Sequence, residues 1–240
     1  MDKKTTVSDS DIILEAKGLH KSFYNPSKVH IIKGIDLVVR RGESVAIMGR
    51  SGQGKSTLLH LLGTLENPCE GQLTIANQEV TAFNKSRIRN RHIAFVFQSF
   101  HLMEDYTALE NVLMPARIAR QRVAKGSTAY NKAHQLLELV GLHERIHFHT
   151  KLLSGGEKQR VAIARALCND PDIIFADEPS GNLDLQTSRA IHDLLLGYAA
   201  KTNKTLIIVT HNSELYELCS KRYTLEAGRL TIVPAKNLHH

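Results

Sequence analysis

The sequence of 240 residues contains no long apolar run. Its most apolar stretches are short ones such as residues 173–176 and 206–209, whereas a helix that spans a bilayer needs roughly 20 apolar residues. The start of the chain also lacks the apolar segment of a secretory signal, and polar residues follow it. We therefore expect residues 1–11 to be a disordered leader, and the chain to span no membrane and to be cytoplasmic.

Cysteine and acidic residues are also scarce. The three cysteines, Cys69, Cys168 and Cys219, lack the pair spacing of a structural zinc site, so we expect reduced thiols with no part in the chemistry. The 31 Lys and Arg outnumber the 24 Asp and Glu, for a formal net charge of +7. This charge suits anionic partners such as nucleotides or a membrane surface. Because the basic residues are spread along the chain, we expect no nucleic-acid partner.

The order of the apolar segments predicts an α/β fold with a parallel sheet. Short runs that are apolar on both faces alternate with helical patterns, as in a doubly covered parallel sheet. Residues 12 to about 80 read mainly as strands, residues 99–168 as a helical subdomain, and the end from Tyr223 as a small hairpin. The predicted strands are residues 44–48, 92–97, 172–176 and 204–209, and the predicted helices are residues 55–62, 186–200 and a helical stretch from 108 to about 142.

A glycine-rich loop lies between the first of these strands and the first helix. It matches the phosphate-loop pattern G-x-x-x-x-G-K-[ST] in full, and the strand and helix around it are the context that this pattern requires. Backbone N–H groups of such a loop bind phosphate, its lysine reaches the outer phosphates, and its serine ligates Mg²⁺. The predicted ATP-binding residues are Gly49, Arg50, Ser51, Gly52, Gln53, Gly54, Lys55, Ser56 and Thr57.

Two neighbouring carboxylates, Asp177 and Glu178, follow the predicted strand 172–176. Ligand sites of parallel sheets lie at this end of the strands. Beside a phosphate loop, Asp177 suits a metal ion, and Glu178 is placed to polarise the water that attacks the γ-phosphate. Nucleotide kinases, GTPases, helicases and recombinases share this much, so the two features alone leave the class of enzyme open.

A third motif separates these classes. Residues 152–167 read LLSGGEKQRVAIARAL, which resembles the signature segment of the ABC ATPase family. Ser154, Gly155 and Gly156 open its helix, and free N–H groups at a helix start form a second anion site. The resemblance extends over about residues 12–232 and implies a single ABC ATPase domain at residues 12–240, with a RecA-like phosphate-loop core, an antiparallel β subdomain and a helical subdomain.

The resemblance also implies roles for further residues. Phe23 corresponds to the aromatic that stacks on adenine, although Tyr24 is adjacent to it. Gln98 resembles the glutamine that contacts Mg²⁺ and the attacking water, and His211 resembles the histidine that contacts the γ-phosphate. In the family, two copies pair head to tail, so that Ser154 and Gly156 of one copy face the ATP bound to the other. The implied catalytic residues are thus Glu178, His211 and Gln98, and the implied Mg²⁺ ligands are Ser56, Gln98 and Asp177.

The sequence departs from the family pattern at three places. Glu157 replaces the commoner glutamine, Arg50 and Gln53 replace small residues of the phosphate loop, and Asn212 replaces an aspartate after His211. Arg50 and Gln53 lie at variable positions, and glutamate followed by a basic residue also occurs in the family at the position of Glu157, so we expect an active ATPase. Asn212 bears on the finer arrangement around His211.

Residues 97–115 are similar to the lipoprotein-releasing LolD type of the family. This resemblance implies membrane permease subunits that dock near residues 99–115, and a peripheral position on the cytoplasmic face of the inner membrane. The macrolide-exporter and cell-division FtsE types share much of this pattern and remain alternatives. A phosphate-loop kinase is a weaker alternative, because a kinase would not need the segment that begins at Ser154.

Overall fold

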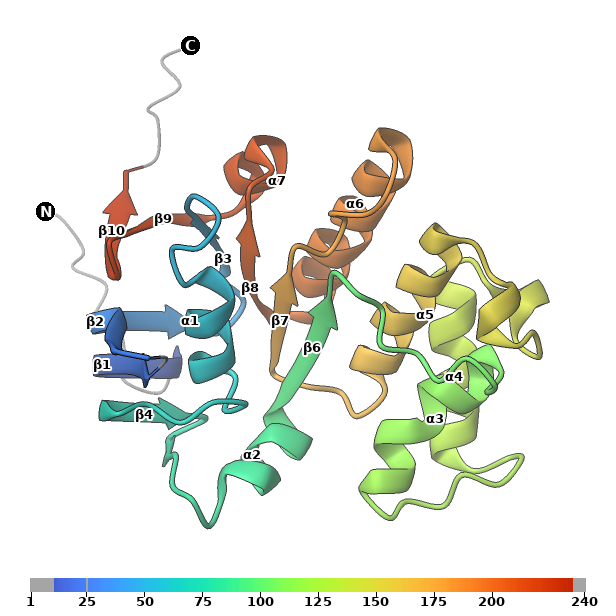
Figure 1. The fold of residues 1–240 in the computed structure, drawn as a ribbon. Helices are drawn as coiled ribbons and strands as arrows, with labels where there is room; N and C mark the ends of the chain where they lie inside the picture. Colours follow the sequence, from blue (N-terminus) through green and yellow to red (C-terminus); the bar gives the residue numbers. More distant parts are fainter. Residues whose placement is uncertain (1–10, 25, 235–240) are drawn as a thin grey trace, which may run out of the picture.

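The computed structural model describes residues 11–24 and 26–234, and the predicted leader therefore lies almost wholly outside the described residues. Ten strands form two sheets within this part of the chain. A four-stranded antiparallel sheet has the order β2-β1-β4-β5 and consists of β1 (Ile12–Tyr24), β2 (Lys28–Arg40), β4 (Glu70–Ile75) and β5 (Gln78–Glu79). It lies at the left of Figure 1, in front of α1 (Lys55–Leu62).

The second sheet has six strands in the order β10-β9-β3-β8-β7-β6. It is parallel except for the antiparallel pair of β9 (Lys221–Glu226) and β10 (Arg229–Val233). The central strands are β3 (Ser44–Met48), β8 (Thr205–Thr210), β7 (Ile173–Asp177) and β6 (Ile93–Phe97). All six residues of β8 are buried, as expected for a strand covered on both faces.

Two apolar cores cover the two faces of the six-stranded sheet. One core joins α1 and the antiparallel sheet to side chains such as Ile47, Phe175 and Val209. The other core lies on the opposite face and includes residues of α6 (Leu185–Thr202) and α7 (Ser213–Leu218). Successive residues of a strand point to opposite faces, so β3, β7 and β8 contribute side chains to both cores. Packing on both faces fixes the carboxyl ends of these three strands.

A helical lobe follows β6 and fills the right of Figure 1. It contains α3 (Ala108–Ile118), α4 (Thr128–Leu139) and α5 (Gly155–Leu167), which pack against one another. Helix α3 begins with a reciprocal cap, in which the Thr107 hydroxyl accepts from the Glu110 N–H and the Glu110 carboxylate accepts from the Thr107 N–H. Such a cap fixes where a helix starts.

The predicted elements agree with the structure except for α7, which was not predicted, and in the region between β5 and α4. Strand β3 and helix α1 have the predicted bounds. The stretch predicted as helical from Ala108 to about Leu142 is two helices, because the chain turns at Arg120 and Gly126 with positive φ of 57° and 82°. Helix α2 (Lys85–His92) was not predicted, and it takes the first residue of the strand predicted at 92–97.

Candidate functional site

A cleft of about 620 Å³ opens at the carboxyl ends of β3, β7 and β8. Elements from four parts of the chain form its walls: β1 and β2, the loop before α1, the end of β6, and the loops after β7 and β8. Its lining residues are Phe23, Ile31, Ser51, Gly52, Gly54, Lys55, Ser56, Thr57, Gln98, Asp177, Glu178 and His211. The sequence predicted all of these residues except Ile31. Phe23 rather than the more exposed Tyr24 faces the cleft.

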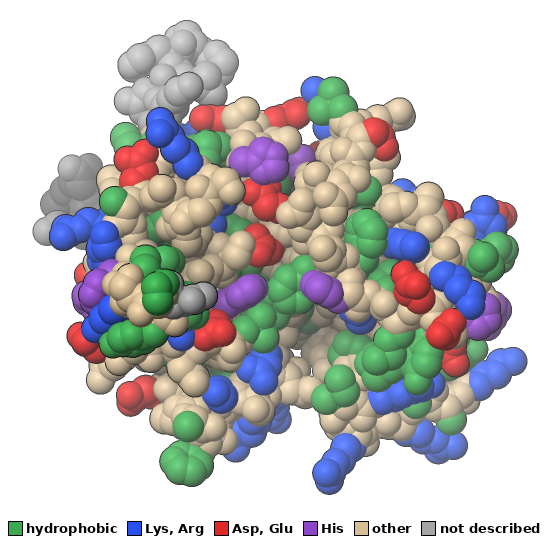
Figure 2. Space-filling model, viewed as in Figure 1, with side chains coloured by type: hydrophobic (Ala, Val, Ile, Leu, Met, Phe, Trp, Pro, Cys, Tyr) green, Lys and Arg blue, Asp and Glu red, His purple; other side chains and the backbone are tan. Residues whose placement is uncertain are grey.

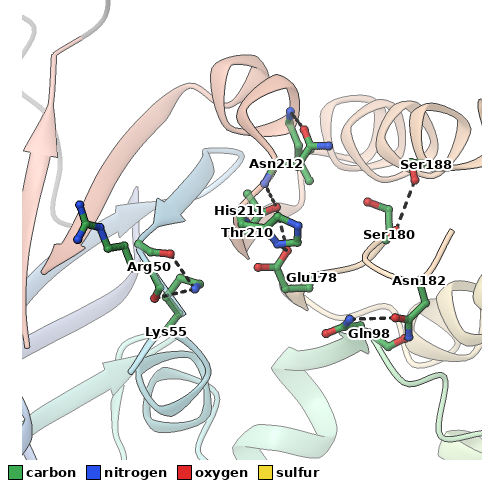
Figure 3. A network of polar contacts seen from close by, with 12 residues as sticks. Arg50, Lys55, Gln98, Glu178, Ser180, Asn182, Ser188, Thr210, His211 and Asn212 are labelled. Atoms are coloured by element: carbon green, nitrogen blue, oxygen red, sulfur yellow. Dashed lines mark hydrogen bonds and ion pairs between the residues drawn. The ribbon is translucent and has the colours of Figure 1, made fainter. Parts of the chain in front are cut away.

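Lys55, at the end of the glycine-rich loop, forms hydrogen bonds with the start of the same loop. The Lys55 ammonium donates to the carbonyl oxygens of Gly49 at 2.8 Å and Arg50 at 3.2 Å (Figure 3). Gly52 and Gly54 have φ of 78° and 93°, a region that only glycine enters without strain. The loop therefore has the backbone conformation that directs N–H groups into the cleft, with a cation beside them.

Two predicted loop residues point elsewhere. The side-chain oxygen of Gln53 accepts from the N–H of Ala227 at 2.9 Å and ties the loop to the turn between β9 and β10. Arg50 is exposed and its guanidinium lies away from Lys55 in Figure 3. Neither side chain lines the cleft, so any contact of these residues with a ligand would come from the backbone.

Asp177 ends β7 at the floor of the cleft. Burial raises the pKa of its carboxyl, and a hydrogen bond with Ser56 and the charge of Lys55 partly oppose that rise. The Ser56 hydroxyl and the Asp177 carboxyl therefore lie in contact, with Gln98 lining the same cleft. Mg²⁺ prefers oxygen ligands and keeps several waters when it joins one or two carboxylates to phosphates, and this donor set fits such an ion.

The carboxylate of Glu178 is held by the end of β8. Its Oε2 accepts from the Thr210 hydroxyl and the His211 N–H, both at 3.2 Å, and lies 2.9 Å from His211 Nδ1 (Figure 3). Glu178 has a φ of 47°, and a non-glycine residue in this region stores roughly 1–3 kcal/mol of strain. A strained backbone held in place by its surroundings is common at functional sites.

The side chain of Gln98 reaches the loop that follows Glu178. Its Nε2 donates to Asn182 Oδ1 at 3.1 Å, and the Asn182 amide donates back to the Gln98 carbonyl at 3.4 Å. The same loop is fixed to α6, because the Ser180 hydroxyl lies 2.7 Å from Nε2 of the buried His192. Loop 178–184 thus connects the start of the helical lobe, α6 and the cleft.

The predicted anion site at the start of α5 lies outside the cleft. Ser154 caps α5, and it shares a reciprocal cap with Glu157: the Glu157 N–H donates to Ser154 Oγ at 3.3 Å. The hydrogen bond with the Ser154 N–H lowers the pKa of the Glu157 carboxyl, and Arg145 pairs with it at 3.2 Å. The negative charge of Glu157 is therefore balanced, and Ser154 and Gly155 are exposed.

Two residues near the cleft carried no sequence signal. Thr210 holds Glu178, and His192 holds Ser180. A threonine at a strand end and a histidine within a helix occur throughout proteins, so only the fold reveals these contacts. Asn182, which holds Gln98, lies in the segment 180–184, which resembles the family's D-loop at the interface between two copies. Asn212, in contrast, caps α7 by accepting from the Leu215 N–H at 2.9 Å, a role that aspartate fills equally well.

A parallel sheet with a glycine-rich loop between β3 and α1 and acidic residues at the end of β7 defines a phosphate-loop nucleotide-binding protein. Residues 32–181 match the family model described as "ABC transporter". The chain belongs to the ABC transporter family, and within it the chain is an ATP-binding cassette that hydrolyses ATP.

Relatives and solved structures agree with this family. A "Lipoprotein-releasing system ATP-binding protein LolD" of Protochlamydia amoebophila is 62% identical, over 93% of this chain and 98% of the relative. A protein of the same name from Cytophaga hutchinsonii is 44% identical, over 90% and 97%. The solved "post-hydrolysis state of the ATP-binding cassette MJ0796 bound to ADP and Pi", a dimeric structure, is 35% identical with a TM-score of 0.85, and the match covers 93% of this chain and 99% of that one.

Within the described part of the chain, every helix is too short or too polar to cross a bilayer.

Proposed function

We propose that the chain is the ATP-hydrolysing subunit of a lipoprotein-releasing ABC transporter, and that two copies pair head to tail below membrane-spanning partners. One observation carries the pairing: the cleft holds the phosphate loop and both acidic residues, while the start of α5 lies outside it. An exposed helix start with unpaired N–H groups attracts anions. A second copy would bring this helix start to the γ-phosphate.

Different residues of the cleft would bind the phosphates, bind the adenine and orient the attacking water. The backbone of the phosphate loop and Lys55 would bind the phosphates, and Phe23 would stack on the adenine. Glu178 would orient the attacking water, because its Oε1 makes none of the contacts that hold Oε2. The exposed side chain of His211 would contact the γ-phosphate from the open side. The proposed nucleotide contacts are those of residues 49–57, Phe23, and Ser154, Gly155 and Gly156 of the second copy.

Ser56, Asp177 and Gln98 would hold Mg²⁺. The ion would supply positive charge beside the phosphates, and it would favour the ionised form of Asp177, opposing the effect of burial on that carboxyl. Gln98 would then exchange its bond with Asn182 for one in the cleft, which links the occupancy of the cleft to loop 178–184.

Membrane partners would dock in a groove between α2 and α3. This groove has a volume of about 320 Å³ and is lined by apolar residues that include Phe95, Met114 and Ile118. It takes in Met114 and Pro115 from the predicted docking segment 99–115. Of the other apolar residues there, Leu102 packs partly on the core, whereas Met103 and Tyr106 are exposed.

Similarity to the LolD proteins over nearly the whole chain supports lipoprotein release as the process that ATP hydrolysis by this chain drives. By this proposal the chain is peripheral, on the cytoplasmic face of the inner membrane. The macrolide-exporter and cell-division types are the alternative, and the identity of co-purified membrane subunits would distinguish them.

The molar mass of the Glu178→Gln protein with and without Mg-ATP tests the pairing. Glutamine keeps the shape of glutamate but cannot act as a base, so bound ATP should persist and convert monomers to dimers in light scattering after size exclusion. Adding Ser154→Arg should keep ATP binding and abolish the dimer. A dimer that survives Ser154→Arg would contradict the composite site.

A further inference from the structure

Two long segments of the chain contain no acidic residue. Residues 80–103 include Lys85, Arg87, Arg89 and Arg91, and residues 111–137 include Arg117, Arg120, Arg122, Lys125 and Lys132. Neither segment has an Asp or Glu to balance these charges. The segments are distant in sequence, but α2 of the first and α3 of the second form opposite walls of the groove between them.

Both segments reach the lower edge of the molecule in Figure 1, through the loop before α2 and the loop between α3 and α4. Figure 2 shows Lys and Arg side chains along this edge, on both sides of a hollow. Five of the exposed cations, together with one aromatic, form a surface that we name the basic edge: Phe83, Arg87, Arg91, Arg120, Arg122 and Lys125.

The cations of the basic edge are not fixed by the fold. Among the described residues, no carboxylate pairs with Arg87, Arg91, Arg120, Arg122 or Lys125, whereas other surface cations such as Arg189 and Lys151 have partners. A fixed protein partner usually meets preorganised charges. Exposed cations without a carboxylate partner instead suit a fluid layer of phosphate groups, whose positions adjust to the side chains.

The exposure of Phe83 is the second observation that favours a layer of lipid headgroups as the partner of this surface. Its side chain is 101% exposed, the highest value among the large apolar residues of the described chain, and it stands two residues before Lys85 at the tip of the loop that precedes α2. An isolated aromatic at a projecting tip beside cations matches the way in which peripheral proteins enter a headgroup layer.

We propose that the basic edge binds the anionic lipid surface beside the membrane partners. This inference rests on the proposed function, because docking in the groove between α2 and α3 would direct the same edge toward the bilayer. The edge would hold phosphate-bearing headgroups by charge and insert Phe83 among them, so that the subunit stays at the membrane when it is not docked.

Vesicle flotation of the full chain tests the proposal, with phosphatidylcholine vesicles that contain or lack 30% phosphatidylglycerol. Each Lys or Arg near an anionic surface adds roughly a fivefold factor in affinity, so the pair Arg87→Gln and Arg91→Gln should weaken binding about 25-fold. Arg120→Gln with Arg122→Gln should do the same. Phe83→Ser should weaken the binding that remains at 0.5 M salt, where charge is screened at roughly 4 Å.

The matched control is Lys33→Gln with Arg229→Gln. It removes the same charge from exposed positions at the other end of the molecule, where the Lys33 N–H donates to Gly228 at 2.9 Å. This control should change vesicle affinity less than about threefold.

Equal binding to both kinds of vesicle, equal loss in the control, or full binding by the edge variants would overturn the proposal. Edge variants that bind vesicles normally but lose the membrane subunits would assign the edge to a protein partner instead. ATP hydrolysis by the same variants distinguishes the two proposals, because a failure of lipid binding with intact hydrolysis leaves the proposed function standing.

Discussion

At the scale of single residues, the position of Glu178 depends on a hydroxyl that no motif contains. Thr210 is buried, donates to Glu178 Oε2 at 3.2 Å and accepts from the Asn212 N–H at 3.0 Å. Hydrogen bonds to charged groups contribute about 1.5–3 kcal/mol. The Thr210 hydroxyl therefore has enough interaction energy to decide where the carboxylate lies.

We expect Thr210→Val to lower kcat of ATP hydrolysis by about tenfold with little change in KM, because a bond that orients the carboxylate is lost. Steady-state phosphate release measures this effect. Thr205→Val is the matched control, since Thr205 is equally buried at the other end of β8, where its hydroxyl donates to the Arg40 carbonyl. A tenfold fall of kcat in both variants would show that β8, rather than the Glu178 contact, matters.

The residues of the cleft show how far the sequence predicts a site. The phosphate loop, Asp177, Glu178, Gln98 and His211 could be found because fixed spacing and strand context carry their chemistry. The cleft is lined by the last four and by Ser51, Gly52 and residues 54–57 of the loop segment. Thr210 and His192 could not, because a hydrogen bond between residues on different elements leaves no local pattern. Phe23 and Tyr24 could be separated only when the pleat of β1 showed which one faces the cleft.

At the scale of elements, loop 178–184 is anchored to α6 by the Ser188 hydroxyl and by one buried histidine. His192 is 2% exposed, its Nε2 lies 2.7 Å from the Ser180 hydroxyl, and its Nδ1 has no hydrogen-bond partner among the described residues. Burial lowers the pKa of this imidazole below its ordinary value. The folded chain therefore holds His192 neutral.

Stability should consequently depend on pH through His192. The unfolded chain binds the proton more readily, so this contribution is complete above about pH 6.5 and is lost as the pH falls toward the lower folded-state pKa. We expect the melting temperature to fall less between pH 7.5 and 5.5 in His192→Gln, which cannot be protonated, than in the native chain. One kcal/mol corresponds to about 2–4 °C for a chain of this size.

The control for this measurement is His143→Gln, which changes an exposed histidine. Equal pH slopes in all three proteins would show that His192 makes no contribution. A flatter slope only in His192→Gln would identify the anchor of loop 178–184 as the acid-sensitive part of the fold.

Helix α2, like the short α7, was not predicted from the sequence. The composition of α2 explains why. Only Ile88 of its eight residues is buried, and four of the others are Lys or Arg. Without an apolar stripe there is no helical periodicity to detect. The helix follows Asn84, whose side chain accepts from the Thr81 N–H and donates to the Glu79 carbonyl, each at 2.8 Å. The contacts of Asn84 with the preceding turn, rather than a hydrophobic pattern in the sequence, therefore mark where α2 begins.

At the scale of the whole molecule, the start of α5 lies outside the cleft, and the proposed pairing predicts a dependence of hydrolysis on concentration. If two chains complete one site, the hydrolysis rate per chain should rise with chain concentration until the dimer predominates, and then become constant. Phosphate release over a hundredfold dilution series measures this dependence. A rate per chain that is constant over the whole series, together with a monomeric mass, would show that one chain is sufficient.

The hydrogen bonds of Lys55 bear on how nucleotide can be exchanged. Its ammonium donates to the carbonyls of Gly49 and Arg50, at the start of its own loop. A phosphate could replace these carbonyls as the partner of the ammonium by rotation of one side chain, and such rotations are fast compared with backbone rearrangements. We therefore expect nucleotide exchange to need little change in the backbone of the loop.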